Sequence, residues 1–249
     1  RANRCPRLDT ETPMAAETID ISNAMLTAPT ALGDWMLVAP VGLPILFGAV
    51  LLMVRHETRL HAGIAIAGLL LTLGANAALL LQVLADGPQV MTMGRWLPPF
   101  GISFTADALG ASLAFVATLV ASVCALYAMK DIGATGRRYG FYPFLMLLMA
   151  GVGGSFLTGD IFNLYVWFEV FLISSFGLLI LGSTDRQLDG ATKYAILNLV
   201  GTTLFLTATA YLYGTFGTLN MADIARKADA MRETGPLMTL TVLYLLAFG

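Results

Sequence analysis

Residues 141–181 read FYPFLMLLMAGVGGSFLTGDIFNLYVWFEVFLISSFGLLIL. A helix of about 20 apolar residues crosses the hydrocarbon core of a bilayer. The stretch therefore predicts two transmembrane helices, Phe141–Thr158 and Ile161–Leu181, joined by a turn at Gly159-Asp160. Its apolar runs do not alternate with polar residues, so they exclude the strands of a membrane β-barrel. Three glycines of the first helix favour close packing against a neighbouring helix: Gly151, Gly153 and Gly154.

The same apolar pattern continues on both sides of this stretch, between polar or Gly/Pro-rich connections. Four more segments are predicted to span the membrane: Trp35–Val54, Ala62–Leu84, Ala108–Met129 and about Lys193–Gly214. A seventh segment begins near Pro236 and is too short to cross when the sequence reaches Gly249. We therefore predict an all-α, polytopic membrane helical bundle with about six complete transmembrane helices and the start of a seventh, in a chain expected to continue beyond Gly249.

Composition supports a membrane protein and excludes several other classes. Apolar residues make up 57% of the 249 residues, charged residues only 12%, and the mean hydropathy is +0.75. A soluble domain carries about 25% charged residues, so an ordinary soluble enzyme and a disordered chain are both excluded. The net charge of -2 provides no basic surface for phosphate backbones, and we expect no nucleic-acid partner.

The chain divides into two parts of different composition. Residues 1–34 form a polar N-terminal tail, which lacks the apolar run of a signal peptide. Residues 35–249 form the predicted transmembrane domain. The two cysteines, Cys5 and Cys124, support neither a disulfide framework nor a metal site, and no motif for a bound cofactor is present. We therefore expect no cofactor and no metal.

Lysine and arginine residues predict the orientation in the membrane, since they are enriched in cytoplasmic loops. Seven of them follow the first, third and fifth predicted spans: Arg55, Arg59, Lys130, Arg137, Arg138, Arg186 and Lys193. The connections on the other side carry fewer or balanced charges. This bias predicts an external N-terminus and an external Asp160 in a multi-pass protein of a prokaryotic inner membrane.

Glu169 is the one acidic or basic residue deep within a predicted span. It lies nine residues after Asp160, which is about 13 Å along a helix and therefore near the middle of the bilayer. Inserting a charge there costs at least about 2.5–3.5 kcal/mol, and such residues mark ion or proton routes. Glu169 is therefore the leading candidate for proton transfer. The alternative is a protonated acid that only hydrogen-bonds a neighbouring helix.

Other polar residues within or near the spans are weaker candidates. Asn76, Asn163 and Asn198 could line a hydrated path, although each could instead hydrogen-bond between helices. Lys193, at the inner boundary, is a candidate proton relay, although the positive-inside bias also explains it.

The residues around Glu169 resemble a known family. Residues 147–170 look like the signature of the proton-conducting, antiporter-like subunits that respiratory complex I shares with multisubunit Na⁺/H⁺ (Mrp) antiporters. The most specific part is Gly-Asp-Ile-Phe-Asn at 159–163 followed by Phe-Glu-Val at 168–170. Residues 172–180, 193–198 and 214–225 are most similar to the D-type subunits of the Mrp antiporters.

This resemblance implies a bundle of about fourteen helices built from two inverted repeats, of which the sequence covers the first part. It implies that Glu169 matches the essential glutamate of the fifth helix, which works with a lysine expected just beyond Gly249. It also implies that the chain has no redox centre, and that its partners are the other antiporter subunits, the lipid bilayer, protons, and Na⁺ or another monovalent cation.

Three functions remain open at this point. The first is a subunit of a multisubunit cation/proton antiporter. The second is a non-redox proton-pumping subunit of complex I, which is an NADH:quinone oxidoreductase, or of a membrane-bound hydrogenase. The third is a structural membrane scaffold in which Glu169 only packs helices.

Overall fold

The computed structural model of the chain describes residues 32–97, 101–229 and 235–248. Most of the polar tail predicted at 1–34 lies outside these residues, and its end forms the 3-10 helix Leu32–Leu37. The described residues contain seven long helices: α1 (Ala39–Met53), α2 (Thr58–Asp86), α3 (Ala108–Asp131), α5 (Phe141–Phe156), α6 (Ile161–Leu179), α7 (Asp185–Phe216) and α9 (Gly235–Phe248). Shorter elements lie between them: β1 (Gln89–Thr92), the 3-10 helix Met93–Arg95, β2 (Ser103–Ala106), α4 (Ala134–Arg138) and α8 (Met221–Asp229).

The long helices confirm the predicted all-α membrane bundle. Every apolar segment identified in the sequence coincides with one of them. Helices α2, α3, α6 and α7 are long and apolar enough to cross a membrane. Helices α1, α5 and α9 are equally apolar but shorter, with 15, 16 and 14 residues.

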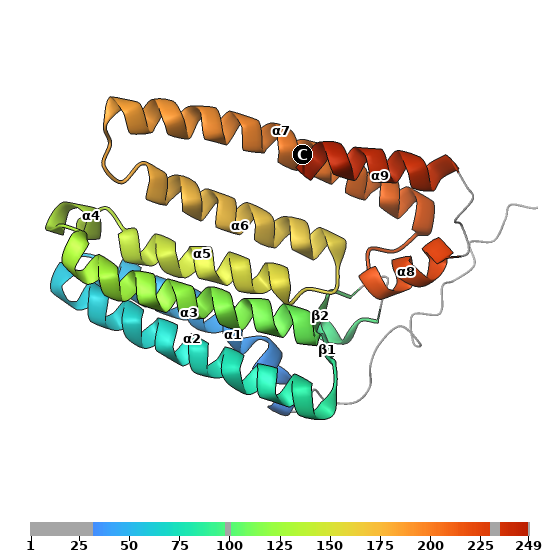
Figure 1. Cartoon of the computed structure of the whole chain (residues 1–249), viewed down its shortest axis with the longest axis horizontal. Helices are drawn as coiled ribbons and strands as arrows, with labels where there is room; N and C mark the ends of the chain where they lie inside the picture. Colours follow the sequence, from blue (N-terminus) through green and yellow to red (C-terminus); the bar gives the residue numbers. More distant parts are fainter. Residues whose placement is uncertain (1–31, 98–100, 230–234, 249) are drawn as a thin grey trace, which may run out of the picture.

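Helix α5 is at the centre of the arrangement. Helices α1, α3 and α6 pack against α5, and α2 packs against α1 and α3. Helix α7 packs against α9 and less extensively against α6. Figure 1 shows the long helices side by side, with α7 and α9 on the edge opposite α1 and α2. The connections richest in lysine and arginine, which include α4 and the α6–α7 turn, lie together at the end away from the two strands (Figure 1).

The α5–α6 interface explains the glycines of α5. A Cβ atom on Gly151 would lie only 2.7 Å from the backbone nitrogen of Phe171, and one on Gly154 would overlap the ring of Trp167. Gly153 lies instead against a backbone carbonyl of α1. The close helix packing predicted from these three glycines is therefore confirmed.

Helix α7 begins earlier than the sequence predicts. The expected start was near Lys193, because the preceding residues are polar, but the helix begins at Asp185. Thr184 and Gln187 form a capping box there, in which each side chain bonds the other residue's backbone N–H. This cap supplies partners for N–H groups that a helix start leaves free, so the polar segment is helical.

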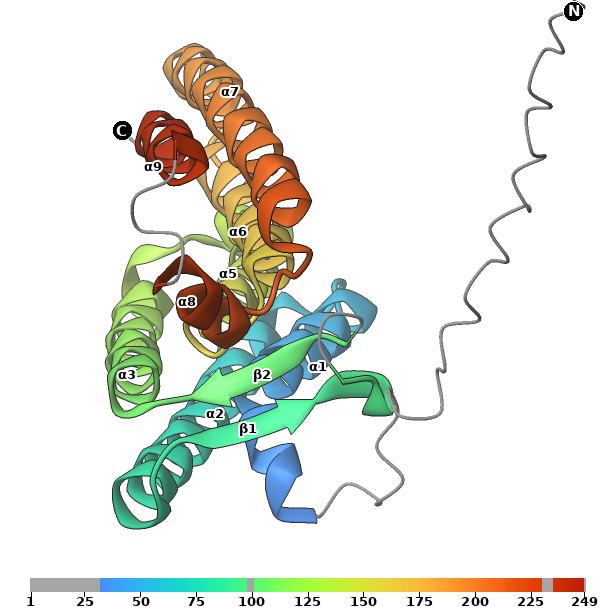
Figure 2. The ribbon, with the colours of Figure 1, turned by 90° about the vertical axis from the view of Figure 1, so that its right-hand side faces the viewer.

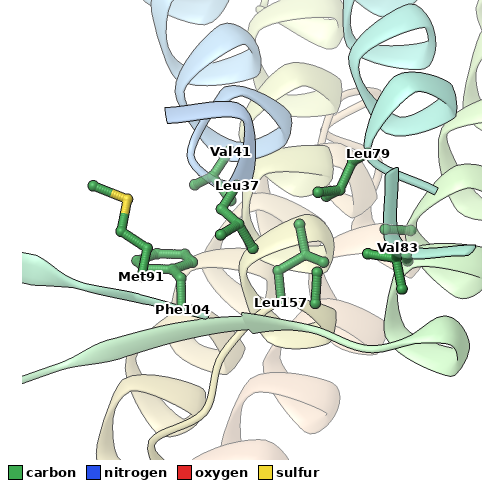
Figure 3. Packing of buried hydrophobic residues seen from close by; sticks show 10 residues of the cluster. Leu37, Val41, Leu79, Val83, Met91, Phe104 and Leu157 are labelled. Atoms are coloured by element: carbon green, nitrogen blue, oxygen red, sulfur yellow. The ribbon is translucent and has the colours of Figure 1, made fainter. Parts of the chain in front are cut away.

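The Gly/Pro-rich connection between α2 and α3 contains a β-hairpin. Strands β1 and β2 pair antiparallel, with Gln89 opposite Ala106 and Thr92 opposite Ser103. Figure 2 shows this hairpin lying across one end of α1 and α2. Its apolar side chains pack in a buried cluster with residues of both helices and with the end of α5 (Figure 3): Leu37, Val41, Leu79, Val83, Met91, Phe104 and Leu157. The hairpin is thus fixed to the bundle.

Candidate functional site

Helix α6 carries the leading candidate, and its start is set by Asp160. The Asp160 backbone is extended, and its Oδ1 accepts a hydrogen bond of 2.8 Å from the Asn163 backbone N–H. An aspartate in this position satisfies a backbone donor that the helix start would leave unpaired. The Asn163 side chain in turn donates to Thr158 Oγ1 at 2.9 Å. Asn163 is therefore buried and bonded at the helix start, on a different face of α6 from Glu169.

Backbone hydrogen bonds tie this turn to two distant parts of the chain. The Gly159 carbonyl accepts from the Met221 N–H, and the Gly159 N–H donates to the Ser103 carbonyl, both at 2.9 Å. The Asn220 side chain also donates to Ser103 Oγ at 2.9 Å. The Gly-Asp-Ile-Phe-Asn segment therefore joins the hairpin, α6 and the α7–α8 connection, which are far apart in the sequence.

The Asp160 carboxyl is buried within this junction. Loss of solvent around it raises its pKa above the ordinary value of 3.8, and hydrogen bonds from the backbone N–H groups of Asn163 and Phe162 partly oppose that rise. Burial is the larger effect because it disfavours the charged form of the carboxyl. The group is a buried helix cap whose charge is costly.

Glu169 lies in the middle of α6 on the side that faces α7. Helical spacing places Tyr165, Glu169 and Phe176 on one face. Tyr165 and Phe176 both contact aromatic residues of α7, which fixes the direction of this face. Glu169 is partly buried and interacts electrostatically with the Tyr165 hydroxyl one turn earlier. No ion pair to Glu169 forms among the residues that the structure describes.

Aromatic rings surround the space between α6, α7 and α9. The Phe205 ring of α7 lies at their centre, 5.7 Å from Tyr165, 6.3 Å from Phe168, 5.7 Å from Tyr244 and 5.0 Å from Phe248, measured between ring centres. A cavity of about 410 Å³ lies beside this cluster, and its walls come from the same three helices. Phe168 is the residue of α6 that lines this cavity, and Glu169 follows it directly in the sequence without lining the cavity itself.

Two further candidates, Asn198 and Lys193, lie on α7. The Asn198 side chain lines the cavity and donates to the Tyr194 carbonyl of its own helix at 2.9 Å. Lys193 is exposed, and its Nζ lies 2.7 Å from Asp189 Oδ2. Tyr194 contacts Phe176, so Lys193 is level with a part of α6 that is roughly 10 Å further along the helix than Glu169.

Asn76 is separated from the other candidates. Its side chain donates to Thr118 Oγ1 at 3.0 Å between α2 and α3, and both residues are buried. Helix α5 lies between this pair and α6 (Figure 1). The structure thus brings Glu169 and Asn198 to the same side of α6, and leaves Asn76, Asn163 and Lys193 elsewhere.

Sequence reasoning did not identify two polar residues of helices α6 and α7, Tyr165 and Thr209. Tyr165 was detectable, because it precedes Glu169 by four residues and therefore shares its helix face. The other is Thr209, whose hydroxyl lies 3.2 Å from the Tyr244 hydroxyl between α7 and α9. That contact depends on how two helices pack, and no local pattern indicates it.

Comparisons with known proteins identify the family of the chain. The family described as NADH:quinone oxidoreductase/Mrp antiporter, TM, matches residues 158–249, which include α6 and α7. The D-type subunit of a Na⁺/H⁺ antiporter from Alkalihalophilus pseudofirmus is 38% identical over 217 residues, or 86% of this chain. The chain belongs to the NADH:quinone oxidoreductase/Mrp antiporter family. It spans 43% of the length of that relative.

Two solved structures share the fold. A chain of the Mrp complex from Dietzia sp. DQ12-45-1b is similar over 88% of this chain and 40% of its own length, with a TM-score of 0.77 and 30% identity. A chain of a membrane-bound sulfane sulfur reductase, an archaeal respiratory membrane complex, is similar over 85% of this chain and 44% of its own length, with a TM-score of 0.79 and 27% identity. The chain is a multi-pass membrane protein of this family.

Proposed function

We propose that the chain is part of a membrane subunit of a multisubunit Na⁺/H⁺ antiporter, and that Glu169 binds and releases the transported proton. The observation that carries this proposal is the 38% identity to the D-type subunit of an antiporter over 86% of the chain. The position of Glu169 supports its assigned role, because among the described residues it is the one Asp, Glu, Lys or Arg deep within a long apolar helix, and it lies on the face of α6 directed toward α7.

The chemistry follows from the surroundings of this carboxylate. A carboxylate held away from water and from positive charge favours the protonated form, whereas a nearby ammonium favours the ionised form. A lysine that approached and withdrew would therefore make Glu169 release and take up a proton. In an antiporter, the proton moves inward down its gradient and the coupled cation is exported.

The polar residues on α7 suggest a route for this proton. Asn198 lines the cavity beside α6, and Lys193 lies nearer the end of the bundle, where its partner is Asp189. We place Lys193 at the entrance of the route and Asn198 further inside. Asn76 and Asn163 are bonded to Thr118 and Thr158 respectively, so their proposed place is beside the route rather than on it.

The wider assignments belong to the same proposal. The partners are the other subunits of an antiporter complex, the lipid bilayer, protons, and Na⁺ or another monovalent cation. The location is the inner membrane of a prokaryotic cell. The N-terminus is external, because lysine and arginine residues gather at the opposite end of the bundle.

A second function is favoured by one specific observation. The archaeal respiratory complex contains a chain with a TM-score of 0.79 and 27% identity to this one. The alternative is therefore a non-redox, proton-conducting subunit of a respiratory complex. In that case the same Glu169 would carry protons, but their movement would be driven by electron transfer in other subunits.

Replacement of Glu169 by glutamine in the full-length, assembled complex tests the proposal. Glutamine keeps the size and hydrogen bonding of the side chain and removes the titratable proton. We expect Glu169→Gln to lower Na⁺-dependent proton movement by about 100-fold or more, the contribution of a positioned proton-transfer group. Glu169→Asp should retain part of the activity. The measurement is the pH change across inverted membrane vesicles after Na⁺ is added, with Asp86→Asn at the exposed end of α2 as the control.

The outcomes separate the three functions. Normal Na⁺-dependent activity in the glutamine variant would reject a proton-carrying role and favour a scaffold. A wild-type complex that moves protons only when a redox substrate is supplied would favour the respiratory alternative. Assembly of the complex, measured in parallel by size-exclusion chromatography, distinguishes lost transport from lost structure.

A further inference from the structure

A polar cavity lies at the end of the bundle away from the hairpin, distant from Glu169. It has a volume of about 780 Å³ and lies between the α1–α2 connection and α4 (left in Figure 1). Its walls include two arginines and four other side chains able to hydrogen-bond: Arg55, His56, Thr58, Thr135, Arg138 and Tyr139. Neither the proton route nor the junction at Asp160 uses these residues.

The cavity carries unbalanced positive charge. No acidic side chain lines it among the described residues, and both of its arginines are exposed. Arg138 forms no ion pair or hydrogen bond in the described part of the chain. Arg55 makes one long contact of 3.4 Å, from its Nε to His56 Nε2, which leaves its terminal nitrogens free. Two guanidinium groups therefore line this cavity without a partner anion among the described residues.

The neighbouring Arg137 shows that not every arginine of this loop lacks a hydrogen-bond partner. Its guanidinium donates to the carbonyls of Met129 and Ile132, at the end of α3. That arrangement satisfies free carbonyl groups of a helix end. Two adjacent arginines thus differ: Arg137 stabilises α3, whereas Arg138 points its charge into the cavity.

The start of α2 adds hydrogen-bond donors to the same space. Helix α2 has 29 residues, its first residue Thr58 lines the cavity, and no side chain caps it. The first N–H groups of a long helix carry partial positive charge and favour a bound anion. The cavity therefore combines two arginines, hydroxyl groups and a helix start, which is a donor set suited to phosphate.

Exposed apolar side chains flank the residues that line this cavity. Met53, two residues before Arg55, is 83% exposed, Leu60, two residues after Thr58, is 54% exposed, and Tyr139 in the cavity wall is 60% exposed. These residues lie where apolar helices end, which is the depth of lipid headgroups. A ligand that carries both a phosphate and acyl chains would satisfy the donors and cover the apolar residues.

We propose that this cavity binds the phosphate group of an anionic phospholipid. The headgroup phosphate contacts Arg55 and Arg138, and the acyl chains lie along the exposed residues next to Met53 and Leu60. Basic pockets between transmembrane helices bind phospholipid headgroups in this way. Free inorganic phosphate shares the headgroup chemistry, but it leaves the apolar residues uncovered.

Photo-crosslinking in the full-length, assembled complex tests the proposal. The probe is phosphatidylglycerol with a photoreactive group near the headgroup, and the readout is labelled peptide from residues 53–60 or 134–139. We expect labelling to fall about fivefold for each arginine removed, or about 25-fold in the double variant Arg55→Gln/Arg138→Gln. Arg186→Gln is the matched control, since Arg186 is exposed at the same end of the bundle but outside the cavity.

Competition in the wild-type complex gives an independent test that needs no variant. We expect unlabelled phosphatidylglycerol to abolish the labelling, whereas phosphatidylcholine and millimolar inorganic phosphate leave it unchanged. Equal competition by phosphatidylcholine would overturn the proposal. So would protection by inorganic phosphate, which would assign the cavity to a soluble anion, or unchanged labelling in an assembled double variant.

Discussion

The two faces of α6 are built in different ways. The face toward α5 is closely packed: Gly151 and Gly154 of α5 lie directly against Phe171 and Trp167 of α6. The face toward α7 carries Glu169 together with aromatic rings, and Phe168, next to Glu169 in the sequence, lines a cavity of about 410 Å³. One helix thus has a rigid side and a side with space beside it.

Under the proposed function, this difference separates residues that maintain the fold from Glu169, to which we assign proton transfer. On the packed side, polar groups bond each other, as Asn163 does with Thr158 at 2.9 Å. On the side toward α7, Glu169 has no ion-pair partner among the described residues, and it interacts with the Tyr165 hydroxyl. A group that changes its protonation needs few fixed partners, because a carboxylate held by several hydrogen bonds would keep one charge state.

The largest loss of stability is expected from adding a side-chain atom to the packed interface between α5 and α6. A methyl group on Gly151 would lie 2.7 Å from the Phe171 backbone, which cannot rotate away as a side chain could. We expect Gly151→Ala to destabilise the protein by about 1–3 kcal/mol, as overpacked interiors do. The measurement is the unfolding temperature of the assembled, full-length protein in detergent.

The matched control for this variant is Gly63→Ala. Gly63 lies within α2, and a Cβ atom there would meet no other atom within 4 Å. We expect this change to be neutral or to stabilise by about 0.5–1 kcal/mol, the usual gain when alanine replaces glycine in a helix. Equal unfolding temperatures for the two variants would show that the α5–α6 interface has room to adjust, and the contrast between the faces would fail.

A smaller loss of stability is expected from removing the helix cap at the start of α6. Asp160→Ala removes the acceptor that the Asn163 N–H bonds at 2.8 Å. We expect a loss of about 1 kcal/mol in stability, typical of a lost helix cap. Asp160→Asn keeps an oxygen acceptor and should retain most of the stability. The measurement is thermal unfolding. Equal losses of stability in both variants would show that the charge of Asp160 matters more than its oxygen as a hydrogen-bond acceptor for the helix start.

The pH dependence of stability, compared between the wild-type protein and Asp160→Asn, provides a further check on Asp160. Burial raises the pKa of its carboxyl above 3.8 in the folded protein. The protonated form is therefore favoured by folding, and this contribution is fully present below 3.8 and lost as the pH rises through the raised pKa. We expect the wild-type protein to gain stability relative to Asp160→Asn as the pH falls from about 7 to about 4. A difference that stayed constant or reversed would contradict the burial of this charge.

Much of the bundle follows from the sequence because hydrophobic length is a local property. Runs of about 20 apolar residues identify the helices without knowledge of their neighbours. The glycines of α5 indicate close packing for the same reason, since small residues allow helices to approach. Glu169 is also identified from sequence, because one charge stands out within an apolar helix.

The rest depends on contacts between distant parts of the chain. Asn163 and Asn76 look alike in sequence, but only the structure shows that their partners are Thr158 and Thr118. The hairpin was not predicted, since its stability comes from a buried cluster with α1, α2 and the end of α5 rather than from its own residues. The start of α7 was misplaced because polar residues can begin a helix when Thr184 caps it.

The smallest effect is expected from Lys193, on the helix that faces Glu169. Its Nζ pairs with Asp189 at 2.7 Å, and both side chains are exposed. An exposed ion pair contributes at most about 1 kcal/mol to folding stability, so we expect the protein to remain folded without it. If Lys193 lies at the entrance of the route, Lys193→Gln should lower Na⁺-dependent proton movement by about two- to fivefold, far less than Glu169→Gln.

The reason for this difference is the distance of Lys193 from the centre of α6. The Ser175 and Tyr194 hydroxyls lie 3.3 Å apart, which places Lys193 near the end of the bundle rather than beside Glu169. An ammonium in water at that depth changes how often protons arrive but does not set the charge of Glu169, because exposed charges are screened over such distances. Arg186→Gln, at the same end, controls for a general loss of positive charge. If Lys193→Gln removed transport as completely as Glu169→Gln, Lys193 would be the direct partner of Glu169, and the open face of α6 would have to rearrange to bring them together.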